Sequence, residues 1–257
     1  MLMAVGTVGC TTPLERCDAI ARAHDFSRTV VHGAPFDHLV YATNSASLAQ
    51  TLHVYLEGDG TPYLTSQVPA PDPTPRRPVM LQLMTLDDGL AVYVGRPCYF
   101  GLAATPPCSV LDWTSARFSP QVVESLRVVV EELREQYGAR SVEIFGHSGG
   151  GTLAALLARR LTGVERVVTL AGNLDTAAWT ALHGYSPLTG SINPVEEGAL
   201  PAGISQLHVV GERDRNVPSS IVESAAKRLG AGQVRIAAGV RHTCCWESQW
   251  PAILAGH

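Results

Sequence analysis

Short runs rich in β-branched residues alternate along the sequence with longer stretches in which apolar residues recur at helical spacing. Strand patterns occur in LHVYLEGDG (52–60), SVEIF (141–145) and VERVVTL (164–170), whereas SPQVVESLRVVVEELREQYG (119–138) has the pattern of a capped helix. In repeated β-α units each helix carries the chain back, so that the next strand runs in the same direction. The sequence therefore predicts an α/β fold with a mostly parallel central sheet flanked by helices.

The 257 residues are enough for one domain of this class. We divide the chain into an N-terminal segment, 1–27, which we expect to be partly flexible, and a domain that spans 28–257. RTVVHG (28–33) and HLVYATN (38–44) predict an antiparallel pair of strands before the parallel part. Residues 173–205 interrupt the alternation after the sixth strand. Because long insertions are often functional, we expect a small cap over a site there.

Charge and hydropathy exclude some classes of partner. The chain has 19 Lys and Arg against 23 Asp and Glu, and no basic run, so a nucleic-acid partner is not expected. No apolar run is long enough for a membrane span. The start, MLMAVGTVGC (1–10), resembles the tail of a bacterial lipoprotein signal whose modified cysteine would be Cys10. No basic region precedes it and Thr7 stands where Leu is usual, so a truncated signal and an accidental likeness both stay open.

The six cysteines include no C-x-x-C pair, so disulfides are expected rather than a zinc or thioredoxin-like site. Disulfides indicate an oxidising, extracytoplasmic compartment, with membrane contact only through the lipid that Cys10 would carry. Cys98 and Cys108 bracket a proline-rich loop, and a bridge there would add roughly 2–4 kcal/mol. A bridge between the adjacent Cys244 and Cys245 would be strained. We therefore expect one of them to pair with Cys17 and the other to stay reduced.

The glycine-rich stretch FGHSGGGT (145–152) fits three patterns. As a P-loop it fails, because Thr152 stands where the phosphate-binding lysine is required. GGGTLA (149–154) matches G-x-G-x-x-A, but a dinucleotide fingerprint opens the first β-α-β unit, whereas several strands precede this one. GHSGG (146–150) matches G-x-S-x-G between a strand and a helix. That context favours a sharp turn with Ser148 at its apex.

A serine hydroxyl is a weak nucleophile at neutral pH and needs a base, which needs an orienting carboxylate. Asp214 follows the strand pattern QLHVVG, and His242 follows the strand pattern QVRIAA. Ser148, Asp214 and His242 therefore occur in the chain order that this architecture requires. The weaker candidates are Asp175, which follows the preceding strand, and His183 and His208, which do not follow the last strand. Glu212, in the same loop as Asp214, is interpreted as a solvated charge. We interpret His147 as a packed or hydrogen-bonded neighbour rather than as a second base.

With these residues in place, the sequence resembles the α/β-hydrolases. It is similar in particular to bacterial, lipoprotein-type, esterase-like members, through its EGDG, GHSGGG, TLAGNLD and PL-G-S-NP segments. The resemblance covers about 28–250. It implies the α/β-hydrolase fold and a serine hydrolase that cleaves carboxylic esters through an acyl-enzyme, with no metal or organic cofactor. A peptidase, a polyester hydrolase, an acyltransferase and a non-catalytic binding module remain as alternatives on this fold.

The resemblance also assigns an oxyanion hole to the backbone N–H groups of Gly149 and Asp59. The loop departs from the usual histidine-glycine pattern, because Glu57 and Asp59 are anionic. An unpaired carboxylate beside a developing oxyanion would oppose the reaction, so we expect the Asp59 side chain to turn away or to pair with an arginine or backbone group. Aromatic side chains that would line an acyl pocket, or equally pack in the core, are Tyr63, Trp179, Tyr185 and Trp246.

Overall fold

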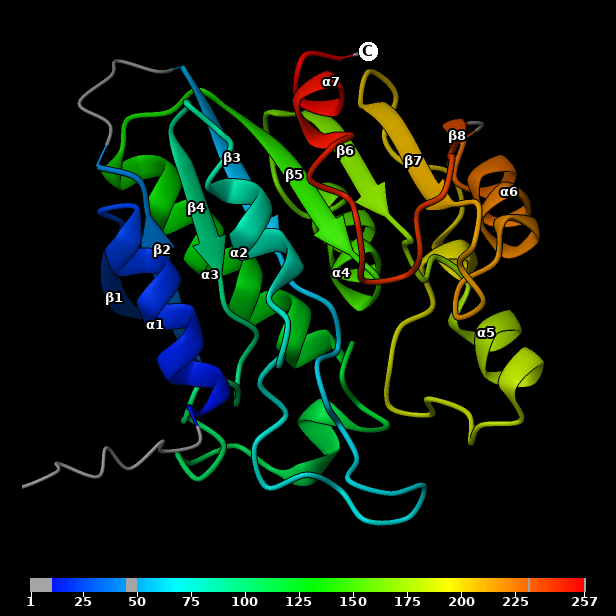
Figure 1. Cartoon of the computed structure of the whole chain (residues 1–257), viewed down its shortest axis with the longest axis horizontal. Helices are drawn as coiled ribbons and strands as arrows, with labels where there is room; N and C mark the ends of the chain where they lie inside the picture. The colour runs from blue at the N-terminus through cyan, green and yellow to red at the C-terminus, as the bar shows by residue number, and fades with distance from the viewer. Residues whose placement is uncertain (1–10, 45–49, 231, 257) are drawn as a thin grey trace, which may run out of the picture.

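A computed structural model describes residues 11–44, 50–230 and 232–256. Its centre is one sheet of eight strands in the order β1-β2-β4-β3-β5-β6-β7-β8 (Figure 1). The strands are β1 (Ser27–His32), β2 (Asp37–Ala42), β3 (Thr51–Leu56), β4 (Ala91–Val94), β5 (Ser141–His147), β6 (Val164–Leu170), β7 (Ser205–Gly211) and β8 (Gln233–Ala237). The helices are α1 (Pro13–Ala23), α2 (Val79–Met84), α3 (Pro120–Gln136), α4 (Gly149–Ala158), α5 (Thr176–His183), α6 (Ser219–Arg228) and α7 (Trp250–Leu254), with 3₁₀ turns η1 (Val110–Trp113) and η2 (Pro194–Glu197).

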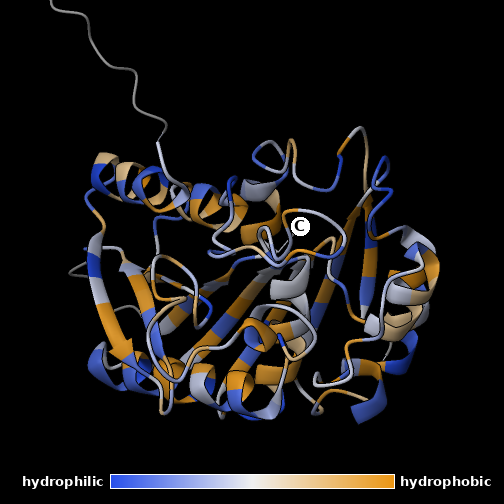
Figure 2. Ribbon diagram, turned by 90° about the horizontal axis from the view of Figure 1, so that it is seen from below, coloured by the Kyte–Doolittle hydropathy of each residue, from blue (hydrophilic) through white to orange (hydrophobic). Residues whose placement is uncertain are grey.

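The sheet is mostly parallel, as predicted. β2 pairs antiparallel with β1 and β4, and every other neighbouring pair is parallel. All four residues of β4 are buried, and six of the seven in β5. Such continuous burial is typical of parallel strands that are covered on both faces. Helices α1, α2 and α7 cover one face, and α3, α4 and α6 cover the other (Figures 1 and 2).

The sequence explains where two helices on the second face, α3 and α4, begin. Ser119 caps α3, since its hydroxyl accepts a hydrogen bond from the Val122 N–H at 3.3 Å, and Pro120 fills the first helical position. Gly138, with a φ of 65°, lets the chain leave this helix. Helix α4 is different, because all ten of its residues are buried. It is the central helix of the domain, and it starts at the predicted serine turn.

The N-terminal segment contributes to the folded domain through α1. Thr12 and Glu15 form a capping box at its start, and Cys17 and Ala21 on its inner face are buried in the main hydrophobic core. Cys10 and the signal-like sequence lie outside the described residues. Among the helices that the structure describes, none combines the length and the apolar character needed to cross a bilayer.

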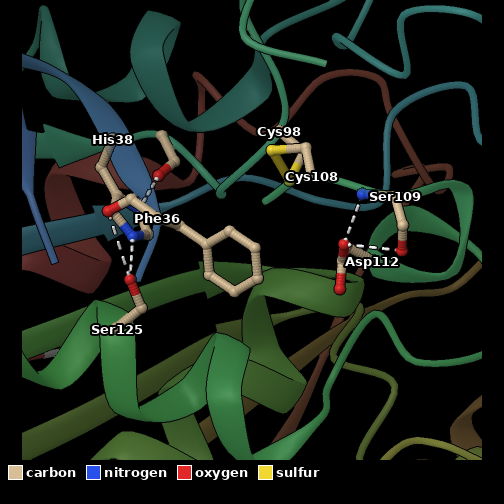
Figure 3. Close-up of a disulfide and its surroundings, with 8 residues drawn as sticks. Phe36, His38, Cys98, Cys108, Ser109, Asp112 and Ser125 are labelled. Carbon is tan, nitrogen blue, oxygen red and sulfur yellow. Dashed lines mark hydrogen bonds between the residues drawn. A yellow bond between two sulfur atoms is a disulfide. The ribbon is translucent and has the colours of Figure 1, made fainter. Parts of the chain in front are cut away.

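Two disulfides are present among the described residues, and they correct one expectation. Cys98 is bonded to Cys108 across the loop that precedes η1, as predicted (Figure 3). The predicted bridge from Cys17 to the Cys244–Cys245 segment is wrong, because Cys244 and Cys245 are bonded to each other. Cys17 faces inward from α1 and is fully buried in the core as a free thiol.

Candidate active site

The turn at Ser148 has the strained geometry that the glycine pattern predicts. Ser148 lies between β5 and α4 with a φ of 52° and a ψ of −118°, a conformation that costs a non-glycine residue about 1–3 kcal/mol. A Cβ on Gly146 would lie 2.2 Å from the Gly150 carbonyl oxygen. A Cβ on Gly150 would lie 2.1 Å from the carbonyl oxygen of Leu56. Glycines on both sides therefore let β3, β5 and α4 meet closely around the serine.

The structure brings the three residues of the predicted triad into one hydrogen-bonded series. Nε2 of His242 lies 3.1 Å from Oγ of Ser148, and Nδ1 of His242 lies 2.8 Å from Oδ2 of Asp214. The second oxygen of Asp214 accepts the N–H groups of Asn216 and Val217 at 2.8 and 2.9 Å. Both carboxylate oxygens are thus fixed. The loops after β5, β7 and β8 supply the three residues.

The environment of His242 favours its neutral, proton-accepting form. Burial lowers the pKa of His242 below its usual value, and the neighbouring His147 adds to this, although the hydrogen bond to Asp214 opposes it. Nε2 of His147 donates to the backbone carbonyl oxygen of His242 at 2.7 Å. The indole of Trp246 donates to the same carbonyl oxygen at 3.0 Å. His147 is therefore a hydrogen-bonded neighbour that holds the His242 backbone.

Asn216 is a site residue that sequence reasoning missed. Its side-chain nitrogen lies 2.9 Å from Nε2 of His242, the atom that also faces Ser148. Its side-chain oxygen accepts the indole N–H of Trp179 at 3.3 Å. Trp179 thereby fixes the amide so that its NH₂ group faces the imidazole. The signal that could have found Asn216 is its place in the acid loop, two residues after Asp214.

The two segments that carry the predicted oxyanion donors lie side by side. β3 and β5 are neighbouring parallel strands, so the loop that follows β3 adjoins the serine turn. A Cβ on Gly149 would lie 2.0 Å from Oδ1 of Asp59. Gly149 also opens α4, so its N–H group is one of those without a partner inside that helix. The Asp59 side chain therefore lies directly against Gly149, the residue after Ser148.

The Asp59 carboxylate is neutralised by two arginines. One oxygen pairs with Arg96 and the other lies 2.8 Å from Nη1 of Arg117. Burial by itself would raise the pKa of Asp59, but the two guanidinium groups outweigh it and lower that pKa. Arg96 donates further to the carbonyl oxygen of Arg117 at 3.0 Å. The expected arginine contact is therefore present, although no local pattern in the sequence identified Arg96 or Arg117.

Comparisons with known proteins bear on the fold. No protein-family model matches the sequence, and no curated protein matches it significantly. Among solved structures, a protein from Agrobacterium tumefaciens that is provisionally assigned as an α/β-hydrolase is 12% identical, with a TM-score of 0.55 over 90% of this chain and 92% of that chain. An esterase from Pyrococcus furiosus is 12% identical, with a TM-score of 0.66 over 97% and 94%. A bacterial membrane phospholipase A is 16% identical, with a TM-score of 0.62 over 95% and 90%.

This chain has the α/β-hydrolase fold. The likeness extends over nine-tenths or more of the chain. Within the α/β-hydrolase fold, the carboxyl ends of the parallel strands form the edge at which Ser148, Asp214 and His242 meet.

An open cleft of about 860 Å³ leads to Ser148 in this α/β-hydrolase domain. Three of the four aromatic candidates, Tyr63, Trp179 and Tyr185, line it. The fourth, Trp246, is buried in the core. The insertion after β6 contributes to the cleft through α5 and the segment that follows it, and Nε2 of His183 donates from α5 to the Asn216 carbonyl oxygen at 2.7 Å. The insertion therefore contacts the acid loop directly.

The other candidates have structural contacts in the α/β-hydrolase fold. Asp175 caps α5 through the Ala178 N–H and pairs with Arg228. His208 is buried in β7 and bonded to the Thr169 hydroxyl at 2.9 Å. Glu212 accepts the Gly239 N–H, and Oε2 of Glu57 accepts the Met80 N–H. The described part of the chain contains no cluster of three or more His, Cys, Asp or Glu side chains placed to hold a metal ion.

Proposed function

We propose that this protein is a serine hydrolase that cleaves carboxylic esters. The observation that carries the proposal is the hydrogen-bonded series from Ser148 through His242 to Asp214, in which Ser148 and His242 line an open cleft. An esterase and a phospholipase are among the structural neighbours, and this supports the reaction class. The two disulfides support placing the protein in an oxidising compartment.

In the proposed reaction, each step of acyl transfer is assigned to a residue of the site. Ser148 attacks the ester carbonyl while Nε2 of His242 accepts the hydroxyl proton, and Asp214 holds the imidazole through Nδ1. The backbone N–H groups of Gly149 and Asp59 stabilise the oxyanion of the tetrahedral intermediate. His242 then returns the proton to the departing alcohol, which leaves an acyl-enzyme. A water molecule, deprotonated by the same imidazole, releases the acid and restores the serine.

Labelling with a fluorophosphonate, followed by intact-mass spectrometry, tests the nucleophile. We expect a single adduct on the wild type and none on Ser148→Ala, together with turnover of p-nitrophenyl acetate, butyrate and octanoate that the variant loses by at least about a thousand-fold. An unlabelled wild type without turnover would favour a non-catalytic binding module. Amide substrates run alongside separate an esterase from a peptidase.

Ser125 provides a matched control, because it makes a similar serine–histidine contact in a different setting. Its Oγ lies 2.8 Å from Nε2 of His38, but both residues are fully buried (Figure 3). Ser125→Ala therefore keeps the adduct and the turnover if access to the cleft determines reactivity. Loss of labelling in both variants, with circular dichroism spectra unchanged, would contradict the assignment of Ser148.

A further inference from the structure

The charged side chains that line the cleft differ in their exposure to solvent and in whether they are paired. Among the described lining residues the carboxylates are Glu57 and Asp59, and both are engaged by protein donors. Arg117 is buried against Asp59. Arg76 and Arg77 are the charged lining residues that are exposed. The cleft thus presents positive charge, although the chain as a whole has a net charge of −4.

Hydrogen bonds hold the backbone of the segment that carries Arg76 and Arg77, the arginine pair. The Thr61 N–H donates to the Pro73 carbonyl oxygen at 2.9 Å, which fixes this segment beside the loop that carries Asp59. The guanidinium of Arg16 donates to the Arg76 carbonyl oxygen. Neither member of the pair forms an ion pair with a carboxylate among the residues that the structure describes. Their guanidinium groups are therefore free to bind a ligand.

The remainder of the cleft is suited to an apolar group. Tyr63 and Tyr185 are 39% and 54% exposed, more than core packing would leave, and both line the cleft with Trp179. The same cleft therefore offers both aromatic surface and positive charge to a ligand. A neutral, wholly apolar ester would leave the two arginines without a partner.

We propose that the ester accepted by this site carries an anionic group, a carboxylate or a phosphate, which the arginine pair binds. This inference rests on the proposed ester hydrolysis and names its substrate class. A guanidinium presents parallel N–H donors that match the oxygens of a carboxylate or phosphate, so either anion can be bound by two hydrogen bonds. Binding there holds the substrate while Ser148 reaches the ester carbonyl.

Two matched pairs of esters test this substrate class and separate the two anions. Dimethyl adipate is compared with monomethyl adipate, and 1-butyrylglycerol with 1-butyrylglycerol 3-phosphate, by titrating the acid released. We expect wild-type kcat/KM to favour the anionic member of at least one pair by about ten-fold, as charge-assisted hydrogen bonds would give. The preference should fall toward unity in Arg76→Gln/Arg77→Gln, and in 1 M salt.

Arg22→Gln is the matched control, because Arg22 is an exposed arginine at the end of α1 and does not line the cleft. It removes a single arginine charge outside the cleft and should leave the preference unchanged. Equal or lower kcat/KM for both anionic esters in the wild type, or a preference that survives the double substitution, would overturn the inference. Normal turnover of the neutral esters would in that case leave the proposed ester hydrolysis intact.

A binding measurement tests the anion site independently of turnover. Calorimetric titration of Ser148→Ala with adipate and with glycerol 3-phosphate should detect binding that weakens about ten-fold or more when the arginine pair is also replaced by Gln. Binding that is absent, or unaffected by the replacement, would contradict the site even if the protein proved to be no hydrolase.

Discussion

At the scale of single residues, the site depends on how each charge is compensated. Asp59 illustrates this, because its carboxylate lies beside the turn at Ser148 and would oppose an oxyanion if it were free. Arg96 and Arg117 remove that conflict by pairing with both carboxylate oxygens. The Asp59 N–H can therefore serve the oxyanion while its side chain cross-links the loops after β3 and β4. The acidic loop is thus compatible with acyl transfer.

Asn216 should set the pH at which His242 becomes a base. Its NH₂ group donates to Nε2, and a hydrogen bond to the neutral imidazole lowers the pKa. Because His242 must be neutral to accept a proton, Asn216→Ala should raise its pKa and move the acidic limb of the kcat/KM profile to higher pH. Asn216→Asp should move it further, since a carboxylate stabilises the imidazolium. Measuring both profiles with p-nitrophenyl butyrate checks this order.

Identical acidic limbs in the wild type and both variants would show that Asn216 has no effect on the base. A merely structural role for Asn216 predicts a different result, in which kcat/KM falls evenly at every pH. The position of the limb therefore separates the two roles.

At the scale of elements, the sequence predicted the repeating strands and helices, but it did not predict contacts between segments that are distant in the sequence. Alternating strand and helix patterns predicted the parallel sheet, and the loops after β7 and β8 predicted Asp214 and His242, because these signals are local. The arginines that pair with Asp59 come from segments far along the chain, so no spacing rule finds them. The bond between Cys244 and Cys245 was missed for the same reason, because burial of Cys17 by the core is a tertiary property.

The junction of β3, β5 and α4 should tolerate no side chain at Gly150. The Cβ of Gly150→Ala would meet the Leu56 carbonyl oxygen at 2.1 Å, and backbone cannot yield as a flexible side chain can. We expect the free energy of unfolding to fall by roughly 3 kcal/mol or more, and turnover to be lost, as for overpacking in a rigid site. Urea denaturation at pH 7 measures the loss.

Gly184→Ala is the comparison for this prediction. Gly184 ends α5 with a φ of 64°, and a Cβ there would meet nothing within 4 Å. Only the backbone conformation is unfavourable, so the expected cost is about 1 kcal/mol. Similar losses in the two variants would mean that steric closeness at the turn is not what requires glycine.

At the scale of the whole molecule, two buried histidines, one bonded between the sheet and α3 and one within the sheet, couple stability to pH. His38 in β2 donates from Nδ1 to the Gly95 carbonyl oxygen at 2.8 Å and accepts the Ser125 hydroxyl of α3 at Nε2 (Figure 3). His208 in β7 contacts Thr169 in β6. Burial lowers the pKa of each histidine to about 4. Both side chains are therefore neutral in the folded protein at pH 5–7.

The unfolded chain takes up protons at these histidines near pH 6.5, whereas the folded protein does so only near pH 4. Between these values the unfolded state binds more protons, so the free energy of unfolding must fall as the pH falls, and the loss from these groups levels off below about pH 4. A difference of this size amounts to roughly 3 kcal/mol for each histidine.

Urea unfolding at pH 7, 5.5 and 4 should show this decrease in the free energy of unfolding. His208→Gln should keep about half of the loss, and His24→Gln, at an exposed position, should keep all of it. A wild-type free energy that does not change between pH 7 and 4 would contradict the neutral state of both histidines.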